Sequence, residues 1–453
     1  MNQNELKAHV DTIVILMMEN RSFDHLFGSL RLPEHGNRAD VDGLVDLGSI
    51  DYVNSSPSNE LIHPFIAADG PFVKDIPHDR ASVAMQMDLD SNDDASMSGF
   101  VKAYYKAAAT SGVEKPPPMG ILPPAAAPMS AFLAANYALC DRWFAPIPTS
   151  TFPNRLMSIC GDTLSDQTTS SIIPDQKAVY HYLTELGVRW RVYHEGLPFL
   201  LLMKNVWPFI PTDHFRRYSS LANDIATEAD STWPQVIFIE PDYFDSPVRL
   251  SGQPCDDHAP LPMVYGERFL RDAYMTLSRS PRWRKTVMVY TFDEHGGFFD
   301  HVPPLKVPQA APVGANYAPF HTTGPRVPAV IVSPMVAAHV RSEQLDHTSI
   351  LQLLAERFGD PANPITASVT KRRQAGIASV SALLDATLSR TNVPPPAPIP
   401  EPGPEMKPRQ DPMPTVVQEA FANAAMGIVD TCGWAEDVFS EAVVWAKGRG
   451  VGG

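Results

Sequence analysis

The chain has 453 residues, 44% of them apolar and 19% charged, which suits one large α/β domain or two ordinary ones and excludes wholesale disorder. A formal net charge of −15 argues against a nucleic-acid partner, because phosphate backbones bind to basic surfaces. The four cysteines lie far apart and form no C-x-x-C pair, so zinc-ribbon and thioredoxin chemistry are not expected.

The N-terminal segment shows no secretory pattern. Its apolar run, residues 13–18, is too short for a signal peptide and is followed at once by Glu19. The longest uncharged stretch, residues 116–140, contains six prolines and does not resemble a membrane helix. We therefore expect a cytoplasmic protein with at most peripheral membrane contact, and secretion by another route is the alternative.

Four short segments are apolar throughout and end at polar or acidic residues: 12–18, 236–239, 286–291 and 327–332. Continuous apolar runs of this length are typical of parallel strands that are buried on both faces. Segments of helical composition alternate with them at residues 176–186, 263–280 and 342–357.

This alternation predicts an α/β fold with a doubly wound, mostly parallel sheet. The 45 prolines predict long loops between the elements. Ligands of such sheets bind beyond the carboxyl ends of the strands, so we expect the polar residues that follow each strand to lie near the functional site.

The C-terminal part differs in composition from the rest. Residues 394–414 are rich in proline and predict an extended linker, and residues 415–453 have the composition of a helical tail that packs on the main domain or on a partner. We thus expect a main domain over residues 1–393, then the linker, then the tail.

Two groups of potential metal ligands follow predicted strands. Glu19 and Asn20 offer a carboxylate and a carboxamide, which are hard oxygen ligands for a divalent cation, although a solvated turn is the commoner use of such a pair. Asp293 and Glu294 begin a dense group, D-E-H-G-G-F-F-D-H, in which the two glycines allow a tight turn beside a ligand.

The segment PTSTFPNR, residues 148–155, places Thr151 two residues before a proline, near the start of a predicted helix. A hydroxyl there serves as a helix cap or as a nucleophile, and the cap is the commoner role. Arg155 would add a donor for a phosphoryl group, and the helix N-terminus attracts anions.

Isolated histidines are the remaining candidates. His78, His258 and His347, each taken alone, fit a structural histidine better than a catalytic one.

Four motifs in order, IVILMMENRSFDHLFGSL, PTSTFPNR, TFDEHGGFFDHVPPL and LDHTSILQLLAERFG, resemble a known family. It is the phosphoesterase family that holds bacterial phosphatidylcholine-type phospholipases C, plant non-specific phospholipases C and related acid phosphatases. The resemblance runs from about residue 10 to 390 and looks strongest to the plant enzymes. The T-x-P-N-R block is also similar to the sulfatase C-x-P-S-R pattern, which implies an alkaline-phosphatase-like fold.

The resemblance implies a role for each matching residue. Glu19, Asn20, Asp293 and Glu294 match metal ligands, and Thr151 matches a nucleophile that also binds the metal. A set of further residues would lie near the phosphoryl group: Arg155, His78, His258, His301 and His347.

The expected cofactor is one divalent ion, with Ca²⁺, Mg²⁺, Mn²⁺ and Zn²⁺ all open. The expected activity is hydrolysis of the glycerol–phosphate bond of a phospholipid such as phosphatidylcholine, through a phosphothreonine intermediate. The alternatives are an acid phosphatase that acts on phosphomonoesters, and a metal-binding interaction protein without turnover.

Overall fold

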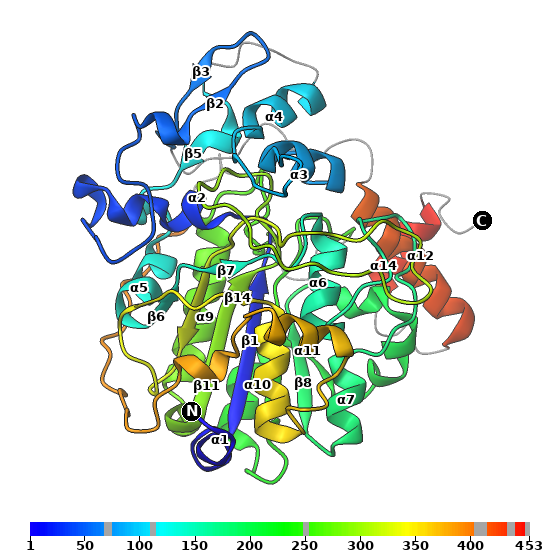
Figure 1. The fold of residues 1–453 in the computed structure, drawn as a ribbon. Helices are drawn as coiled ribbons and strands as arrows, with labels where there is room; N and C mark the ends of the chain where they lie inside the picture. The colour runs from blue at the N-terminus through cyan, green and yellow to red at the C-terminus, as the bar shows by residue number, and fades with distance from the viewer. Residues whose placement is uncertain (68–74, 109–114, 248–252, 403–414, 433–439, 449–453) are drawn as a thin grey trace.

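An eight-stranded sheet forms the centre of the molecule (Figure 1). The computed structural model describes residues 1–67, 75–108, 115–247, 253–402, 415–432 and 440–448. The strands, in their order across the sheet, are β13 (Val340–Arg341), β6 (Ala138–Cys140), β12 (Ala329–Val332), β11 (Thr286–Phe292), β1 (Thr12–Met18), β10 (Val236–Glu240), β8 (Trp190–His194) and β9 (Phe215–Arg217).

Only β12 runs against the other strands of this sheet. It pairs antiparallel with both β11 and β6, whereas every other pair of neighbours is parallel. All seven residues of β1 are buried, as expected for a central strand covered on both faces. The predicted α/β class with a mostly parallel sheet is confirmed.

The reversed direction of β12 corrects one expectation. The segment 327–332 was expected to be a parallel strand whose following residue, Ser333, would lie at the ligand-binding edge. Instead the Ser333 hydroxyl donates to the carbonyl of Thr286, the first residue of β11, at 2.8 Å. The residues before β12, including Arg326, therefore lie at the carboxyl edge, because an antiparallel strand exchanges the two ends.

The helices also follow the sequence pattern, with one exception. The main ones are α1 (Gln3–His9), α2 (Phe23–Phe27), α3 (Arg80–Met87), α4 (Phe100–Ala108), α5 (Pro128–Asn136), α6 (Thr151–Cys160), α7 (Val179–Glu185), α8 (Leu221–Thr227), α9 (Val264–Ser278), α10 (Thr348–Phe358) and α11 (Ala367–Gln374). The predicted helix 342–357 begins only at Thr348. Residues before it form β14 (Leu345–Asp346), which pairs with β7 (Trp143–Phe144).

Helices cover both faces of the sheet. Ile15 and Met17 of β1 line a small internal space with residues of α6 and α10. Tyr290 of β11 is in register with Leu16 and so points to the opposite face, where its hydroxyl lies 2.8 Å from that of Ser130 on α5. The α6–α10 layer and the α5–α9 layer thus enclose the sheet.

A second, smaller hydrophobic core lies beyond the carboxyl edge of the sheet, at the top of Figure 1. It joins α3 and α4 to the short strands β2 (Asn54–Ser55), β3 (Leu61–Ile62), β4 (Phe65–Ile66) and β5 (Gly120–Ile121). Phe299 belongs to it and lies a few residues after β11. This core holds the loop after β11 against the upper part of the molecule.

The C-terminal helices are α12 (Val416–Thr431) and α14 (Ser440–Gly448). Ala420, Phe421 and Ile428 of α12 are buried against the main core. Residues 394–402 of the predicted linker form neither helix nor strand, and residues 403–414 lie outside the described residues.

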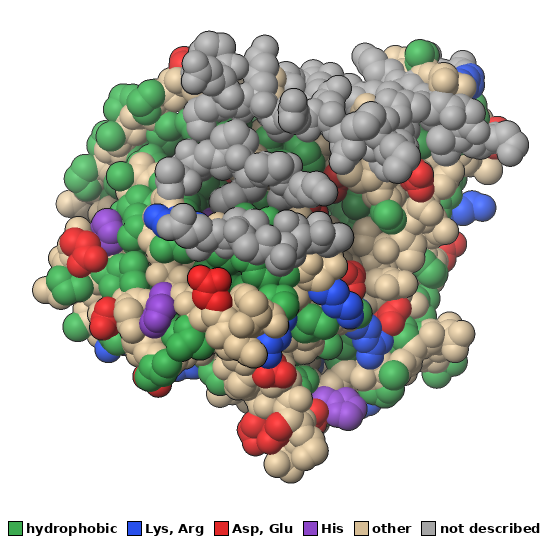
Figure 2. All heavy atoms as spheres, turned by 90° about the horizontal axis from the view of Figure 1, so that it is seen from above, with side chains coloured by type: hydrophobic (Ala, Val, Ile, Leu, Met, Phe, Trp, Pro, Cys, Tyr) green, Lys and Arg blue, Asp and Glu red, His purple; other side chains and the backbone are tan. Residues whose placement is uncertain are grey.

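Seen from above, toward the carboxyl edge of the sheet, the described acidic and basic side chains are scattered among apolar ones (Figure 2). Within the described ranges, no helix has the length and apolar character needed to cross a membrane.

Candidate active site

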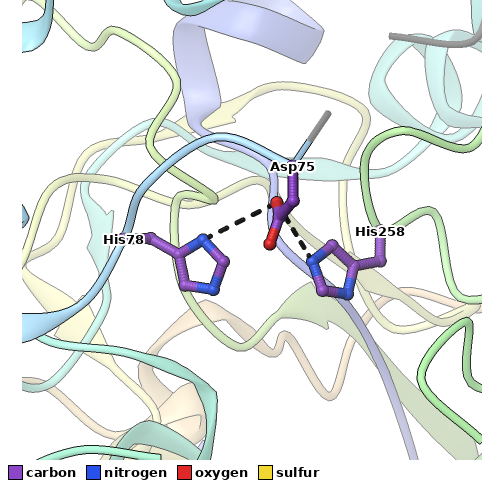
Figure 3. Close-up of side chains that lie close together, drawn as sticks. All are labelled: Asp75, His78 and His258. Carbon is purple, nitrogen blue, oxygen red and sulfur yellow. Dashed lines mark ion pairs between the residues drawn. The ribbon is translucent and has the colours of Figure 1, made fainter. Parts of the chain in front are cut away.

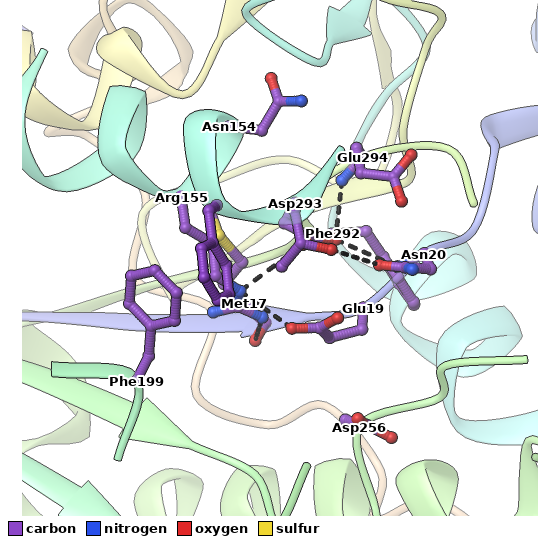
Figure 4. Close-up of polar contacts among 12 residues, drawn as sticks. Met17, Glu19, Asn20, Asn154, Arg155, Phe199, Asp256, Phe292, Asp293 and Glu294 are labelled. Carbon is purple, nitrogen blue, oxygen red and sulfur yellow. Dashed lines mark hydrogen bonds and ion pairs between the residues drawn. The ribbon is translucent and has the colours of Figure 1, made fainter. Parts of the chain in front are cut away.

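The two predicted ligand pairs lie side by side, because each directly follows one of two adjacent strands. Met18, the last residue of β1, is in register with Phe292, the last residue of β11. Glu19-Asn20 and Asp293-Glu294 follow directly, and the Asn20 N–H donates to Asp293 Oδ1 at 3.0 Å (Figure 4). The parallel pairing of two sequence-distant strands therefore brings both pairs to one place, as expected at a carboxyl edge.

In both Asp293 and Glu294, one carboxylate oxygen accepts hydrogen bonds from the backbone and the other accepts none. Asp293 Oδ1 accepts the N–H groups of Asn20 and Glu294, and Glu294 Oε2 accepts that of Gly296 at 2.8 Å. Asp293 Oδ2 and Glu294 Oε1 are buried and have no hydrogen-bond partner. Buried acceptors without a donor are costly, so these two oxygens point to a cation as their partner.

The Gly-Gly pair makes this geometry possible. Gly296 and Gly297 have φ values of 63° and 74°, in the left-handed region. A Cβ on Gly296 would lie 2.1 Å from the carbonyl oxygen of Asn20, so no other residue fits there. Asn20 itself has φ 61°, a conformation that asparagine tolerates better than most residues.

Thr151 is the first residue of α6, and its hydroxyl does not cap the helix. The N-cap residue is Ser150, whose side chain makes no capping hydrogen bond. The N–H of Phe152, in the first turn of the helix, donates to Thr168 Oγ1 at 3.2 Å. The Thr151 hydroxyl instead lies 3.5 Å from Asn20 Oδ1. The prediction that Thr151 more commonly serves as a helix cap is thus wrong here, because Ser150 takes the cap position.

Arg155 lies one helical turn after Thr151 and is buried among the acidic residues. Its Nε donates to Glu19 Oε1 at 3.0 Å and lies 3.5 Å from Asp293 Oδ2. Another guanidinium nitrogen donates to the Tyr243 hydroxyl at 3.1 Å. These contacts make Arg155 a residue that positions the carboxylates, and its donors are occupied by protein groups rather than directed at a phosphoryl group.

The electrostatics of the carboxylates reflect their burial. Burial and the charge of Asp293 raise the pKa of Glu19 well above its usual value. Burial also raises the pKa of Asp293 to about 6, although Arg155 opposes the shift. For Glu294, burial acts in the same direction, but His78 and His295 lower the pKa overall. A site with this excess of buried negative charge favours a bound cation.

His258 and His78 stand over Asn20, one on each side of Asp75 (Figure 3). His258 Nε2 lies 3.0 Å from the Asn20 amide nitrogen and 3.4 Å from Asp75 Oδ1. The His78 Nδ1 atom lies 2.7 Å from the carbonyl of Ile76. That bond leaves His78 Nε2 to face the site, 3.9 Å from Glu294 Oε1.

Neighbouring carboxylates favour the charged form of both imidazoles. Burial acts to lower the pKa of His258, but Asp75, Asp245 and Glu19 raise it well above its usual value. Burial likewise opposes the charge on His78, and Glu294 and Asp75 raise its pKa. Two imidazolium groups thus supply positive charge beside the buried carboxylates.

His347 lies behind the site rather than in it. It is fully buried, its Nδ1 accepts the indole N–H of Trp143 at 3.0 Å, and its Nε2 lies 2.7 Å from the backbone carbonyl of Asp293. Burial lowers its pKa to about 4, so it is neutral. Its contacts therefore fix the Asp293 backbone, which is a positioning role.

His301 belongs to a separate cluster. Its Nδ1 lies 2.6 Å from Asp24 Oδ2, and Arg326 binds both Asp24 and Asp300, at 3.0 and 2.9 Å. None of the contacts recorded for the described residues joins His301 to Thr151 or Asn20. Since Arg326 and His301 both pair with the acids, this cluster is a buried salt-bridge network that ties α2 to the loop after β11.

Three residues near the site were not singled out from the sequence: Asp75, Asp245 and Asn154. Asn154 accepts from the Ile147 N–H and donates to the carbonyls of Thr149 and Ser150, so it shapes the loop that carries Thr151. The PNR motif is the feature of the sequence that could have indicated Asn154. Asp75 and Asp245 had no signal beyond being acidic residues near a histidine or a strand end.

One cavity lies beside His78, and a much smaller space lies beside Thr151. A cavity of about 310 Å³ opens beside His78 and is lined by Asp75, Ile76, Pro77, His78, Asp79, Tyr104 and Ala107. On the other side, a space of only about 10 Å³ separates Thr151 and Glu19 from Val417 and Phe421 of α12. The C-terminal helix thus closes one wall of the site beside Thr151, and the larger cavity lies on the side of His78.

The donor set fits a divalent cation. In the described part of the chain, three groups of acidic and histidine side chains have ligand atoms within 4.8 Å of one another: Asp75/His78/His258, Glu19/Asp256/His258 and Asp24/Asp300/His301. The first two share His258 and surround Asn20. The carboxylates of the first two groups, together with the oxygens of Asp293 and Glu294 that accept no hydrogen bond, suit a hard divalent ion, whose identity the geometry leaves open.

The chain belongs to the Phosphoesterase family, which it matches over residues 10–361. This membership confirms the resemblance seen in the motifs.

Curated relatives carry phospholipase names. The chain is 31% identical over 346 residues to non-specific phospholipase C1 of Arabidopsis thaliana, an alignment that covers 74% of this chain and 62% of the relative. It is 29% identical over 415 residues to non-specific phospholipase C3 of the same plant, covering 85% and 75%. It is 28% identical over 414 residues to phospholipase C B of Mycobacterium tuberculosis (strain ATCC 25618 / H37Rv), covering 79% and 75%.

Solved structures give a more distant likeness. A protein in the alkaline phosphatase superfamily from Vibrio parahaemolyticus has a TM-score of 0.33 and 13% identity, with 54% of this chain and 64% of that chain covered. Phosphonate monoester hydrolase of Agrobacterium radiobacter has a TM-score of 0.33 and 11% identity, with 57% and 72% covered. These likenesses concern the fold alone, and the fold class rests on the sheet topology itself.

The His301 cluster generates a prediction about stability. Burial opposes the charge on His301, but Asp24 raises its pKa from 6.5 to about 9. A pKa that is raised in the folded state contributes stability below the unfolded value, and that stability is lost as the pH rises through about 9. We expect the ion pair to contribute about 3 kcal/mol at about pH 6.

Urea denaturation of the wild type and His301→Gln at about pH 6 and about pH 10 measures this contribution. The difference in the free energy of unfolding should shrink at the higher pH, and His339→Gln, at an exposed histidine, is the matched control. A difference that is constant with pH would contradict the assignment.

Proposed function

We propose that this chain is a metal-dependent phosphoesterase of the phospholipase C type, which hydrolyses the glycerol–phosphate bond of a phospholipid such as phosphatidylcholine. The observation that carries the proposal is the Thr151 hydroxyl beside Asn20, next to two buried carboxylate oxygens that accept no hydrogen bond. The names of the relatives support the phospholipase assignment.

Five residues would hold one divalent ion: Glu19, Asn20, Thr151, Asp293 and Glu294. A bound divalent cation would stabilise the negative charge of the phosphoryl oxygens and favour ionisation of a nearby hydroxyl. Arg155 keeps Glu19 and Asp293 in place for this purpose.

Thr151 supplies the nucleophile in the proposed reaction. Its Oγ, whose proton has passed to solvent, forms a bond to phosphorus while the bond from phosphorus to the glycerol oxygen breaks, which gives a phosphothreonine and the alkoxide of diacylglycerol, and the later attack of water releases Thr151 again as the alkoxide. His78 Nε2 faces the site and donates its proton to that alkoxide. The now neutral His78 takes a proton from water, which attacks phosphorus, releases Thr151 and leaves the phosphorylated head group.

The cations available at the site favour a diester over a monoester. Arg155 is bound to Glu19 and Tyr243, and Arg21 donates to the carbonyls of Asp257 and Leu261, so both arginines have protein partners. The imidazolium groups of His78 and His258 remain. A phosphodiester carries one negative charge fewer than a monoester dianion, so it needs less positive charge beside the proposed ion.

A comparison of substrates tests the proposal. We expect phosphatidylcholine in mixed micelles to be hydrolysed to diacylglycerol and phosphocholine faster than an aryl phosphate monoester at equal concentration. Product analysis by mass spectrometry identifies the bond that breaks. Rapid cleavage of the monoester with no action on micelles would replace the proposal by an acid phosphatase, and inactivity toward both would favour an interaction protein.

The nucleophile assignment predicts the effect of Thr151→Ala. Turnover should fall by several orders of magnitude, because the group that forms the covalent intermediate is missing. Stability should change by less than about 1 kcal/mol, since the hydroxyl caps nothing. Acid-quenched wild type should yield a phosphorylated Thr151 peptide in mass spectrometry.

Thr149→Val is the matched control, because the Thr149 hydroxyl donates to the carbonyl of Asp166 and lies in the same loop. We expect this variant to retain most of its activity. Near-normal turnover in Thr151→Ala would move the nucleophile elsewhere in the loop.

Metal dependence gives a further prediction. Removal of divalent ions with a chelator should abolish activity, and the added ion should restore it and raise the melting temperature, since binding to the folded state stabilises it. Asp293→Asn should lose the rise in melting temperature, and Asp94→Asn, at an exposed carboxylate, should keep it. Full activity in the chelated protein would contradict the metal assignment.

A further inference from the structure

A second cavity lies at the amino-terminal edge of the sheet, remote from the site described above. Its volume is about 560 Å³, within the range of small-molecule pockets. The residues that line it are Asp11, Thr12, Arg189, Asp230, Trp233, Gln235, Pro281, Arg282, Arg284, Lys285 and Arg357.

The position of this cavity follows from the strands. Thr12 opens β1, and the same strand ends directly before Glu19. Seven residues at about 3.3 Å each place the two sites about 20 Å apart, at opposite ends of one strand. The cavity therefore shares no residue with the carboxylate site, and a ligand here would leave that site free.

The lining is rich in positive charge, in contrast to the chain as a whole. Five of its residues are Lys or Arg and two are Asp, in a chain whose net charge is −15. Asp230 pairs with Arg282 at 2.9 Å, and Asp11 pairs with Lys285 at 3.4 Å. Among the described residues, no carboxylate forms a salt bridge with the remaining three cations, Arg189, Arg284 and Arg357.

The cavity is built from fixed groups. Arg189 Nε donates to the Trp233 carbonyl at 2.8 Å, and Arg282 donates to the carbonyls of Ile225 and Glu228. The Arg282 guanidinium also lies 4.8 Å from the centre of the Trp233 ring. These bonds hold two cationic side chains and an aromatic ring in place before any ligand arrives.

Two arginines, Arg284 and Arg357, have guanidinium N–H groups without a hydrogen-bond partner among the described residues. Arg357 is half-buried, and its Nε donates to the carbonyl of Val10, which leaves its terminal nitrogens without a recorded protein partner. Arg284 is exposed and makes no hydrogen bond or ion pair with any other described residue. Burial lowers the pKa of Arg357 although Asp11 acts to raise it, which shows that its charge is partly desolvated.

We propose that this cavity binds a small anion through its phosphate group, which Arg284 and Arg357 hold with their free guanidinium donors. Guanidinium groups match phosphate oxygens in geometry and form charge-assisted hydrogen bonds with them. The concave shape and the single aromatic ring fit a free phosphorylated molecule, and a phospholipid head group offers the same chemistry.

Trp233 provides the test, because it lines the cavity and contacts Arg282. Pyrophosphate titrated into the full chain should change the tryptophan fluorescence with saturation, and Trp233→Phe should abolish that change. Arg284→Glu should weaken binding by about tenfold or more, because it replaces a donor with a like charge. Lys102→Glu, an equal charge reversal at an exposed residue of α4, should leave binding unchanged.

Arg284→Gln keeps the side chain polar and uncharged and guards against misfolding of the Glu variant. A parallel titration with vesicles that contain phosphatidic acid distinguishes the two sources of the phosphate group. A response to soluble pyrophosphate that depends on Arg284 supports a free anion, and such a response to vesicles alone supports a head group. The proposal is overturned if both Arg284 variants bind pyrophosphate and vesicles as the wild type does.

Discussion

The ion pairs of one buried arginine organise the carboxyl edge of this protein. Arg155 is buried with Glu19 and Asp293, which follow two adjacent strands. Buried carboxylates without compensation would strongly destabilise the fold, so this arginine must stay in contact with both. Because Arg155 lies four residues after Thr151 on α6, the same contact that neutralises the acids fixes the start of the helix. The position of the Thr151 hydroxyl beside Asn20 therefore follows from the contacts of Arg155.

The charge at this edge is only partly balanced within the protein. Arg155 serves Glu19 and Asp293, and the imidazolium groups of His78 and His258 stand beside Asp75 and Glu294. One oxygen each of Asp293 and Glu294 remains without a donor. A divalent cation would complete this balance, because burial has already made the negative charge of Asp293 costly and raised its pKa.

The two edges of the sheet differ in charge. Carboxylates gather at the carboxyl edge, and five cations line the cavity at the other. The antiparallel strand β12 adds a third feature, since it brings Arg326 to the acidic edge, where it neutralises Asp24 and Asp300. That buried network holds α2 and the loop after β11 together. It explains why His301, close in sequence to Glu294, belongs to the framework rather than to the site.

The sequence by itself determined the central strands and the ligand pairs that follow them. Continuous apolar runs marked β1, β10 and β11 to within one residue, because buried parallel strands admit few polar side chains. The pairs Glu19-Asn20 and Asp293-Glu294 followed from that, since the carboxyl ends of parallel strands share one edge. The family resemblance added the roles of Thr151 and His78, which the sequence alone left open, and whether the ligand pairs hold a metal stays a prediction.

Only the tertiary structure decided which hydrogen bond each polar group makes. It assigned the cap position to Ser150 and turned Arg155 and His347 into positioning residues. It also reversed the direction of β12 and set α12 against Thr151. Most of these outcomes depend on contacts between residues tens to hundreds of positions apart. A local pattern carries no information about such contacts, because the partner of a buried polar group is fixed by packing and not by its neighbours in the chain.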